Sequence, residues 1–287
     1  MVQNVFFEEM EGMFIERVIR DEEYSMQFRH FHDSYELYFL LEGERYYFID
    51  KETYRVNKGT VVLVKRNQIH KTSMARDSYH DRILVQIREE VFDPFLTANG
   101  LFRVGDLFER NYGVMAIRPE DWTVLERGLL EIREEMHSKR ENYQVMVKFK
   151  MAEILLLLYR YRQTASFVKE NRQVRTVRTA KYQKVHEVAD YLINCCETKE
   201  SLDELAARFY ISKSYICRIF KEVTGFTINE YQNISRIQRG RHLLLHSDYS
   251  ITEIAEQLGY ENITYFERVF KKYTGLTPLK YRKKTAV

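Results

Sequence analysis

Apolar and polar residues are spaced differently in three parts of the chain, and each pattern predicts a different kind of element. Between residues 24 and 88, short runs of β-branched and aromatic residues are separated by turn-forming residues, which is typical of strands. Glu42-Gly43-Glu44 and Asn57-Lys58-Gly59 are predicted turns. Short strands at this spacing favour a jelly-roll barrel. The predicted strands are Tyr35–Leu41, Tyr46–Ile49, Thr60–Val64 and Ile83–Ile87.

From Pro119 onward the apolar residues recur every three or four positions, which indicates helices. An apolar stripe runs from Trp122 to Met136, and a second helix is predicted from about Tyr143 to Arg162. The second helix is apolar over more than one face, so it must bury more than one face. This hairpin is predicted to form a dimer seam, with packing inside a single chain as the alternative. The predicted seam residues are Leu125, Leu129, Ile132 and Met136.

The last third of the chain contains one segment twice. The two copies are offset by fifty residues in most of the segment, and by forty-nine further upstream, where residues 201–206 resemble residues 250–255. Such self-similarity indicates one supersecondary unit that is used twice. The repeated residues are Tyr215, Arg218, Phe220, Lys221, Thr224, Gly225, Thr227 and Tyr231, matched by Tyr265, Arg268, Phe270, Lys271, Thr274, Gly275, Thr277 and Tyr281.

Each copy is predicted to be a short helix, a tight turn and a second helix. In the first copy, Ser201 and Glu204 form a capping box, Tyr210-Ile211 makes the turn and Gly225 ends the second helix. The corresponding residues of the second copy are Ser250, Glu253, Gly259 and Gly275. This order predicts a helix-turn-helix, whose second helix enters the major groove of DNA.

The outer faces of the two predicted recognition helices carry residues suited to DNA. An arginine at the matched position of each copy suits the acceptors of guanine, and a nearby lysine suits phosphate. The predicted contact residues are Lys213, Ser214, Cys217, Arg218 and Lys221, with Asn262, Ile263, Thr264, Glu267, Arg268 and Lys271. The alternative is a helical repeat that binds protein, but solenoids need at least about three repeats.

At these residues the chain resembles the AraC/XylS family of transcription regulators, over about Tyr182 to Lys283. The resemblance implies two helix-turn-helix subdomains joined by a long helix, here about Ile228 to Leu245. Double-stranded DNA and RNA polymerase are then the expected macromolecular partners. The family usually has alanine where Gly240 lies, and a helical glycine costs about 1 kcal/mol relative to alanine, so a less rigid joint is expected. The matching residues are Leu202–Ala206, Ser212, Tyr215, Arg218–Lys221, Thr224-Gly225, Tyr231, Arg236-Ile237, Leu243-Leu244, Ile251–Ala255, Gly259-Tyr260, Tyr265-Phe266, Arg268, Phe270-Lys271, Gly275, Pro278 and Tyr281-Arg282.

The strand-rich part also resembles a known domain. The string His30-Phe-His32-Asp-Ser-Tyr-Glu36, followed by Gly43, Gly59 and His70, resembles the cupin sensor domain at the front of many AraC-family regulators. It covers roughly residues 10–95 and implies a small-molecule sensor, often for a sugar. Aromatic faces can stack on a sugar ring while His, Glu and Arg bond its hydroxyls. For each aromatic residue taken singly, core packing is the favoured explanation, so the prediction rests on the set. The predicted effector-binding residues are Phe28, His30, His32, Glu36, Tyr38, Tyr46, Phe48, His70 and Arg82.

Four of these residues leave a metal site open as an alternative. His30, His32, Glu36 and His70 have the residue types and spacing by which metal-binding cupins hold zinc, iron or nickel. A bound metal would favour a cupin enzyme or metal sensor fused to a DNA-binding domain. We predict instead that these residues line a pocket for an organic ligand, with no metal and no other cofactor. A purely structural role is the third alternative.

Composition narrows the class of protein. The 287 residues suggest about two domains, and no apolar run is long enough to span a membrane. The first residues lack a signal-peptide pattern, and three cysteines cannot form a disulfide framework, so a reducing cytoplasm is expected. The net charge is +3, yet residues 180–287 alone carry 17 Lys/Arg and 13 Asp/Glu, a net of +4. Excess positive charge in that part favours nucleic acid.

Together these patterns predict an α+β protein with four parts. They are a cupin-like effector-binding barrel (1–118), a helical dimerisation hairpin (119–165), a basic linker (166–181) and an all-α double helix-turn-helix domain (182–287). We expect a cytoplasmic, homodimeric regulator, an activator rather than an enzyme, which responds to a sugar or similar molecule and controls a carbohydrate-utilisation operon. A purely architectural DNA-binding protein is a further alternative.

Overall fold

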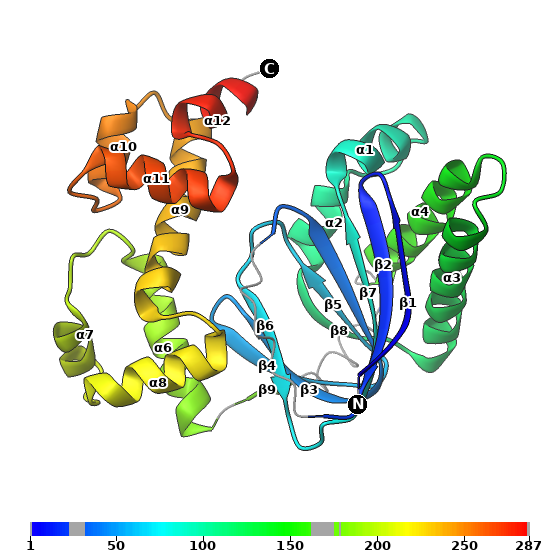
Figure 1. The fold of residues 1–287 in the computed structure, drawn as a ribbon, viewed down its shortest axis with the longest axis horizontal. Coiled ribbons are helices and arrows are strands. Elements are labelled where there is room, and N and C mark those ends of the chain that lie inside the picture. The colour runs from blue at the N-terminus through cyan, green and yellow to red at the C-terminus, as the bar shows by residue number, and fades with distance from the viewer. Residues whose placement is uncertain (1, 23–31, 162–174, 178, 286–287) are drawn as a thin grey trace. The chain divides into compact units, whose positions relative to one another are not determined.

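The computed structural model describes residues 2–22, 32–161, 175–177 and 179–285. The chain divides into two compact units, one formed mainly by residues up to 177 and one mainly by residues 178–287 (Figure 1). The first is a barrel of antiparallel strands with helices on one outer face. Among the described residues 179–285 of the second unit, all regular elements are helices. This agrees with the predicted α+β class.

In the described part of the first unit, nine strands form the barrel. The order is β1-β2-β7-β3-β4-β9, while β5 pairs with β3 and β8, and β6 pairs with β3. The central strand β3 lies between β5 and β7 in its first half and pairs with β6 in its second half. The strands are β1 Val2–Met10, β2 Met13–Arg20, β3 Tyr35–Ile49, β4 Glu52–Asn57, β5 Thr60–Val64, β6 His70–Met74, β7 His80–Ile87, β8 Gly113–Ala116 and β9 Arg175–Thr176.

The predicted turn at Glu42-Gly43-Glu44 is wrong, because β3 runs through it without a break. The register against β7 shifts between Leu40 and Glu42, which marks a β-bulge. Gly43 has a φ of 88°, and a Cβ there would lie 2.3 Å from the carbonyl oxygen of Tyr79. Glycine therefore marks a strand corner here, where the chain passes from one half of the barrel to the other.

The two faces of β3 belong to two different cores. Leu37 and Phe39 share a buried cluster with the helices on the outer face, whereas Tyr38 and Leu40 pack with Val62 inside the barrel. The helices of this unit are α1 Glu89–Ala98, α2 Val104–Asn111, α3 Pro119–Ser138 and α4 Tyr143–Tyr161.

The helical hairpin α3–α4 forms as predicted, and its apolar stripe is part of the barrel's outer core. Gly128 of α3 lets α4 approach closely, since a Cβ there would lie 3.3 Å from Ile154 Cδ1. The four residues predicted for a dimer seam are each at most 2% exposed within the single chain. They are Leu125, Leu129, Ile132 and Met136.

The helical unit contains two helix-turn-helix copies joined by one long helix (Figure 1). The predicted capping boxes at Ser201 and Ser250 are present, and Gly225 and Gly275 end the second helices with positive φ. The helices are α6 Ala180–Asn194, α7 Leu202–Arg208, α8 Lys213–Thr224, α9 Ile228–His246, α10 Ile251–Gln257, α11 Ile263–Thr274 and α12 Pro278–Thr285.

The turns of the two copies differ at one position. Tyr210 and Gly259 both adopt positive φ, at 54° and 76°. Tyr210 is 94% exposed, whereas a Cβ at Gly259 would lie 2.2 Å from the carbonyl oxygen of Glu197. The same backbone conformation is thus open to solvent in one copy and closely packed in the other.

Gly240, in the joining helix α9, has a packing role that the sequence did not indicate. A Cβ at this position would lie 2.9 Å from Leu258 Cδ1 and close to the ring of Phe266. The absence of a side chain lets α9 pack closely on the second helix-turn-helix. The lower rigidity expected of this joint stays a prediction.

Candidate functional sites

The predicted DNA-contacting residues lie on the solvent-facing sides of α8 and α11. Cys217 and Glu267 are half-buried, and the other nine are exposed. Beneath them Ile216 and Phe266 are fully buried, which fixes the rotation of each helix. Both sets of predicted residues are therefore accessible to a partner, whereas the buried faces of α8 and α11 pack against the domain core.

Both matched arginines rest on a tyrosine one helical turn earlier. The guanidinium carbon of Arg218 lies 5.3 Å from the ring centre of Tyr215, and that of Arg268 lies 5.1 Å from the ring of Tyr265. Distances of this size are typical of cation–π contacts. The two tyrosines are part of the repeat but were not predicted as interface residues.

Two other predicted contacts have partners inside the domain. Lys213 forms an ion pair with Asp203 at 2.8 Å. The side chain of Asn262 caps α11 by accepting hydrogen bonds from the backbone of Thr264 and Tyr265. Among the described residues, no ion pair joins Glu267 to Arg268, so the neighbouring carboxylate does not hold that guanidinium.

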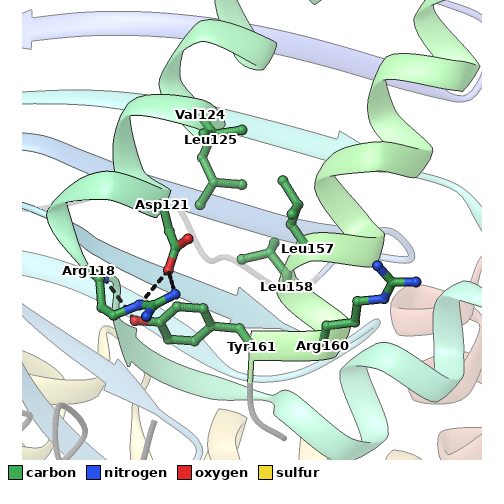
Figure 2. Close-up of a pocket in the computed structure, with 8 residues that line it drawn as sticks. All are labelled: Arg118, Asp121, Val124, Leu125, Leu157, Leu158, Arg160 and Tyr161. Carbon is green, nitrogen blue, oxygen red and sulfur yellow. Dashed lines mark hydrogen bonds and ion pairs between the residues drawn. The ribbon is translucent and has the colours of Figure 1, made fainter. Parts of the chain in front are cut away.

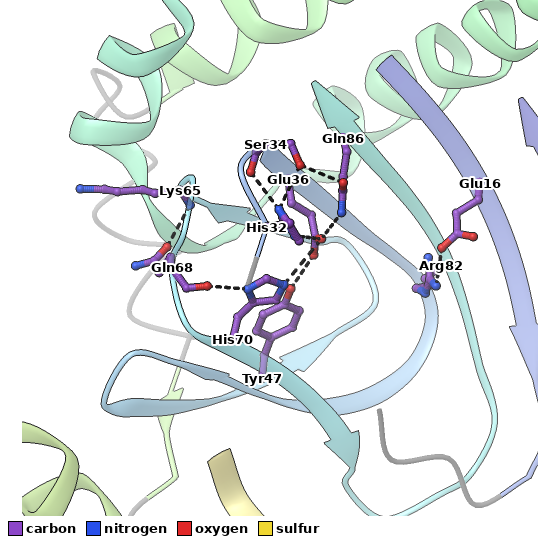
Figure 3. Close-up of polar contacts among 10 residues, drawn as sticks. All are labelled: Glu16, His32, Ser34, Glu36, Tyr47, Lys65, Gln68, His70, Arg82 and Gln86. Atoms are coloured by element: carbon purple, nitrogen blue, oxygen red, sulfur yellow. Dashed lines mark hydrogen bonds and ion pairs between the residues drawn. The ribbon is translucent and has the colours of Figure 1, made fainter. Parts of the chain in front are cut away.

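The barrel interior contains a buried polar network around Glu36 (Figure 3). Glu36 Oε1 accepts a hydrogen bond from the Tyr47 hydroxyl at 2.9 Å, and Oε2 accepts one from Gln86 at 3.1 Å. His32 Nε2 lies 3.1 Å from Oε2, and His70 Nε2 lies 3.6 Å from it. Ser34 extends the network by donating to Gln86 at 2.8 Å.

The tautomers of the two histidines follow from their other ring nitrogens. His32 Nδ1 lies 3.0 Å from the carbonyl of Ser34, and His70 Nδ1 lies 2.9 Å from that of Gln68. A carbonyl only accepts, so each Nδ1 carries a hydrogen and each Nε2 faces Glu36. A bare Nε2 lone pair would repel a carboxylate, so this arrangement requires a hydrogen or a metal ion between each Nε2 and Glu36.

Protonated histidine satisfies that requirement. Burial alone would raise the pKa of Glu36, but the charge of His70 and hydrogen bonds from His32 and His70 hold it well below its usual range. A divalent ion would satisfy it too, since donor atoms of His32, Glu36 and His70 all lie within 4.8 Å of one another. Two imidazoles and one carboxylate form a suitable donor set for zinc, iron or nickel.

A second polar group lies in the same barrel, apart from the Glu36 network (Figure 3). Arg82 Nη2 donates to Glu16 at 2.6 Å, and the Arg82 guanidinium lies 5.9 Å from the ring centre of Tyr38. Both Tyr38 and Arg82 are buried. The interior therefore has two polar regions, one centred on a carboxylate and one on a guanidinium.

The remaining predicted effector residues are placed differently. Tyr46 and Phe48 alternate with Tyr47 and Ile49, which face the interior, so they lie on the other face of β3. Phe28 and His30 lie outside the described residues. Sequence reasoning missed Tyr47, Ser34 and Gln86, which bond within the Glu36 network.

Two hollows in the first unit differ in character. One of about 510 Å³ is lined by Phe14, Ser34, Gln86 and Arg88, so it reaches the Glu36 network from outside. The other, between α3 and α4, measures about 170 Å³ (Figure 2). It has an apolar floor that includes Leu157, and Arg118 at its edge is already bonded to Asp121. Typical ligand pockets measure about 300–1,000 Å³, which favours the first hollow as an effector entrance.

A barrel with a polar interior, in one chain with two helix-turn-helix units, defines a ligand-binding transcription regulator. A model of the AraC-like ligand binding domain matches residues 16–112, and one of a helix-turn-helix domain matches residues 205–284. This chain belongs to the AraC family and is a sequence-specific DNA-binding regulator.

Relatives of known role extend over nearly the whole chain. The HTH-type transcriptional activator RhaS of Klebsiella pneumoniae (strain 342) is 26% identical over 263 residues, covering 87% of this chain and 85% of the relative. RhaR of Escherichia coli (strain K12), also an HTH-type transcriptional activator, is 24% identical and covers 88% and 86%. Among solved structures, the C-terminal domain of the response regulator AraT from Geobacillus stearothermophilus is 27% identical. It covers 37% of this chain and 88% of its own, with a TM-score of 0.35.

Proposed function

We propose that this regulator responds to a small polar organic effector, a sugar or sugar derivative, bound inside the barrel, and that it controls carbohydrate-utilisation genes. The observation that supports this is the buried network of His32, Glu36, Tyr47 and Gln86, which the 510 Å³ hollow reaches. Hydrogen-bonding groups set among the apolar side chains of the barrel interior select hydroxyl-bearing ligands.

The DNA contacts are proposed to follow the repeat. Arg218 and Arg268 read bases in two major-groove segments, while Lys221 and Lys271 bind phosphate. Effector binding alters DNA affinity only if the effector has different affinities for two arrangements of the protein. RNA polymerase is the proposed further partner, and the cytoplasm the proposed compartment. Among the described helices none is long and apolar enough to cross a membrane.

The proposal is tested by screening neutral sugars, sugar acids and sugar phosphates against the full chain. A ligand that binds only the folded state raises the melting temperature as its concentration rises. Each compound that does so is then added to a DNA-binding titration. The proposal predicts at least one compound with both effects, and it fails if no member of the panel changes either quantity.

A metal-dependent role is the second candidate, because the donor geometry of His32, Glu36 and His70 fits a divalent ion. These residues would hold the metal, which would supply a positive charge beside Glu36. We propose that the effector binds without it. Elemental analysis decides: stoichiometric zinc, iron or nickel that is lost on chelation, together with the effector response, would overturn this part.

Dimerisation is also proposed, through the outer face of α4 rather than the buried stripe of α3. Val145, Met146, Phe149 and Leu157 are all at least 36% exposed. At 100° per residue they fall within one third of the helix circumference, so they form one apolar surface. A second copy of the chain offers the same surface, as a two-fold interface requires. The functional boundaries proposed remain 1–118, 119–165, 166–181 and 182–287.

A further inference from the structure

We infer that the effector carries an anionic group, a carboxylate or a phosphate ester, which binds to Arg82 and Tyr38, while its hydroxyls bind toward Glu36. This inference rests on the proposed function, because it specifies the chemistry of the same barrel site. An anionic effector and a neutral sugar require different groups from the protein. A neutral sugar needs donors and acceptors alone, whereas an anion also needs a positive charge.

The strand register places these two residues in adjacent layers of the interior. Arg82 of β7 is paired with Leu40 of β3 and Val18 of β2, and the next interior layer contains Tyr38, Leu84 and Glu16. Residues paired across antiparallel strands point to the same face of the sheet. Tyr38 and Leu40 belong to the interior cluster, so Arg82 and Glu16 point inward as well.

Two buried donors in these layers lack an acceptor. The Tyr38 side chain is 2% exposed and Arg82 is 7% exposed. The Tyr38 hydroxyl and Arg82 Nη1 have no hydrogen-bond partner among the described residues, although Arg82 Nη2 donates to Glu16. Buried polar groups in native proteins are normally satisfied, so unpaired donors at one place indicate a missing acceptor. A carboxylate or phosphate oxygen is an acceptor with the matching charge.

The electrostatic surroundings agree with this geometry. His80 is buried one layer beyond Arg82, and burial together with the charges of Arg45, Arg20 and Arg82 lowers its pKa to about 4. Burial raises the pKa of Tyr38, and the same three arginines oppose that rise. Three arginine charges therefore act on this end of the interior, where Glu16 is paired with Arg82, whereas Glu36 lies at the end reached by the hollow.

A ligand that fits both ends has an anionic group at one end and hydroxyls at the other. Sugar acids and sugar phosphates share this chemistry. Carboxylate and phosphate are separated by using three matched probes on each of two sugar frames: D-glucose, D-glucuronate and D-glucose 6-phosphate, and the three galactose equivalents. Melting temperature and dissociation constant are measured on the full-length protein for each probe.

We expect at least one charged probe to bind at least tenfold more tightly than its neutral parent, since a charged hydrogen bond contributes more than a neutral one. The charged probe that binds more tightly shows whether the anionic group is a carboxylate or a phosphate. A neutral sugar that binds as tightly as its charged derivatives overturns the inference but leaves the proposed function intact. If no charged probe binds, the inference is also overturned.

Substitutions then test the residues. Tyr38→Phe removes one oxygen and keeps the ring, so it is expected to weaken the charged probe about tenfold. Arg82→Lys keeps the charge but not Nη1, and should weaken the same probe. Tyr112→Phe, at an exposed tyrosine outside the barrel, is the matched control and should change nothing. If Tyr38→Phe keeps wild-type melting temperature and wild-type affinity for the charged probe, the assignment of the anion to this end is wrong.

Discussion

Two arginine side chains on the helices proposed to contact DNA lie over tyrosine rings, and neither forms an ion pair with an acidic neighbour among the described residues. Arg218 and Arg268 each lie over the ring of the tyrosine three residues earlier, at nearly equal distances in the two copies. A guanidinium held in this way keeps its hydrogens free for bases, because a ring occupies its face and not its edge. The tyrosines then act as positioning residues.

The contribution of the ring is measured by a double-mutant cycle on Tyr215 and Arg218. Tyr215→Ala should weaken binding to the specific site by about 0.5–1 kcal/mol, the range of an exposed cation–π contact. In an Arg218→Ala background the same change should cost nothing further, while Tyr215→Phe should keep wild-type affinity. Fluorescence anisotropy on labelled DNA gives the dissociation constants of the wild type, the two single variants and the double variant. If Tyr215→Ala weakens binding as much in the Arg218→Ala background as in the wild type, the ring acts independently of Arg218.

His80 makes stability depend on pH. Its pKa is lowered from 6.5 to about 4 by burial and by nearby arginines. As pH falls below 6.5, His80 of the unfolded chain binds a proton, whereas His80 of the folded protein binds one only near pH 4. The free energy of unfolding therefore falls as the pH is lowered through this range.

The corresponding prediction compares His80→Gln with wild type in urea unfolding between pH 7 and pH 4. The variant should lose less stability than wild type over this range. His242→Gln, at an exposed histidine of α9, should follow the wild-type curve. Parallel curves for His80→Gln and wild type would show that the imidazole does not titrate differently on folding.

At the scale of elements, the hairpin α3–α4 has an inner and an outer apolar surface, and only the outer one is free to meet a second chain. Met146→Glu is expected to abolish dimers at micromolar concentration without changing the melting temperature of the monomer, because Met146 is 43% exposed. Leu129→Ala should instead cost about 2–5 kcal/mol of stability, since Leu129 is fully buried. Sedimentation velocity and thermal unfolding separate the two effects; a dimer that survives Met146→Glu rules out this face.

The elements differ in how much their sequence could reveal. Helices α8 and α11 were predictable because capping residues and a 3.6-residue period specify them locally. Helix α3 has no capping side chain, but it begins at Pro119 and shows the same period. The interior of the barrel was not, because the bulge between Leu40 and Glu42 reverses which residues of β3 face inward. A constant period of two selects Tyr46 and Phe48, whereas the bulge brings Arg45, Tyr47 and Ile49 inside.

The Glu36 network likewise depends on contacts between residues that lie far apart in the sequence, which local patterns do not reveal. His32, Glu36 and His70 were predictable from residue type and spacing, but Gln86 comes from a strand fifty residues away in sequence from Glu36. Its partnership depends on the register of β3 against β7, which places Glu36 opposite Gln86. Pairing between distant strands is a tertiary property, so no local pattern could have indicated it.

At the scale of the whole molecule, effector and DNA are proposed to bind to different units, and their affinities are then linked. If the effector changes DNA affinity by some factor, DNA must change effector affinity by the same factor. Glu36→Gln should weaken effector binding while leaving effector-free DNA affinity at the wild-type value. Titrations of each ligand in the presence and absence of the other test this, and unequal factors would reveal a further coupled equilibrium such as dimerisation.

The turn positions of the repeat have a consequence for how the two copies can change. At Gly259 the backbone of Glu197 occupies the place of any side chain, whereas Tyr210 extends into solvent. A library of substitutions should therefore recover many residues at position 210 and almost none at 259, with Tyr210→Gly relieving about 1 kcal/mol of left-handed strain. The two copies are thus under unequal constraint at this turn. Protein engineering can therefore vary the turn of the first helix-turn-helix, whereas the turn of the second must keep its glycine.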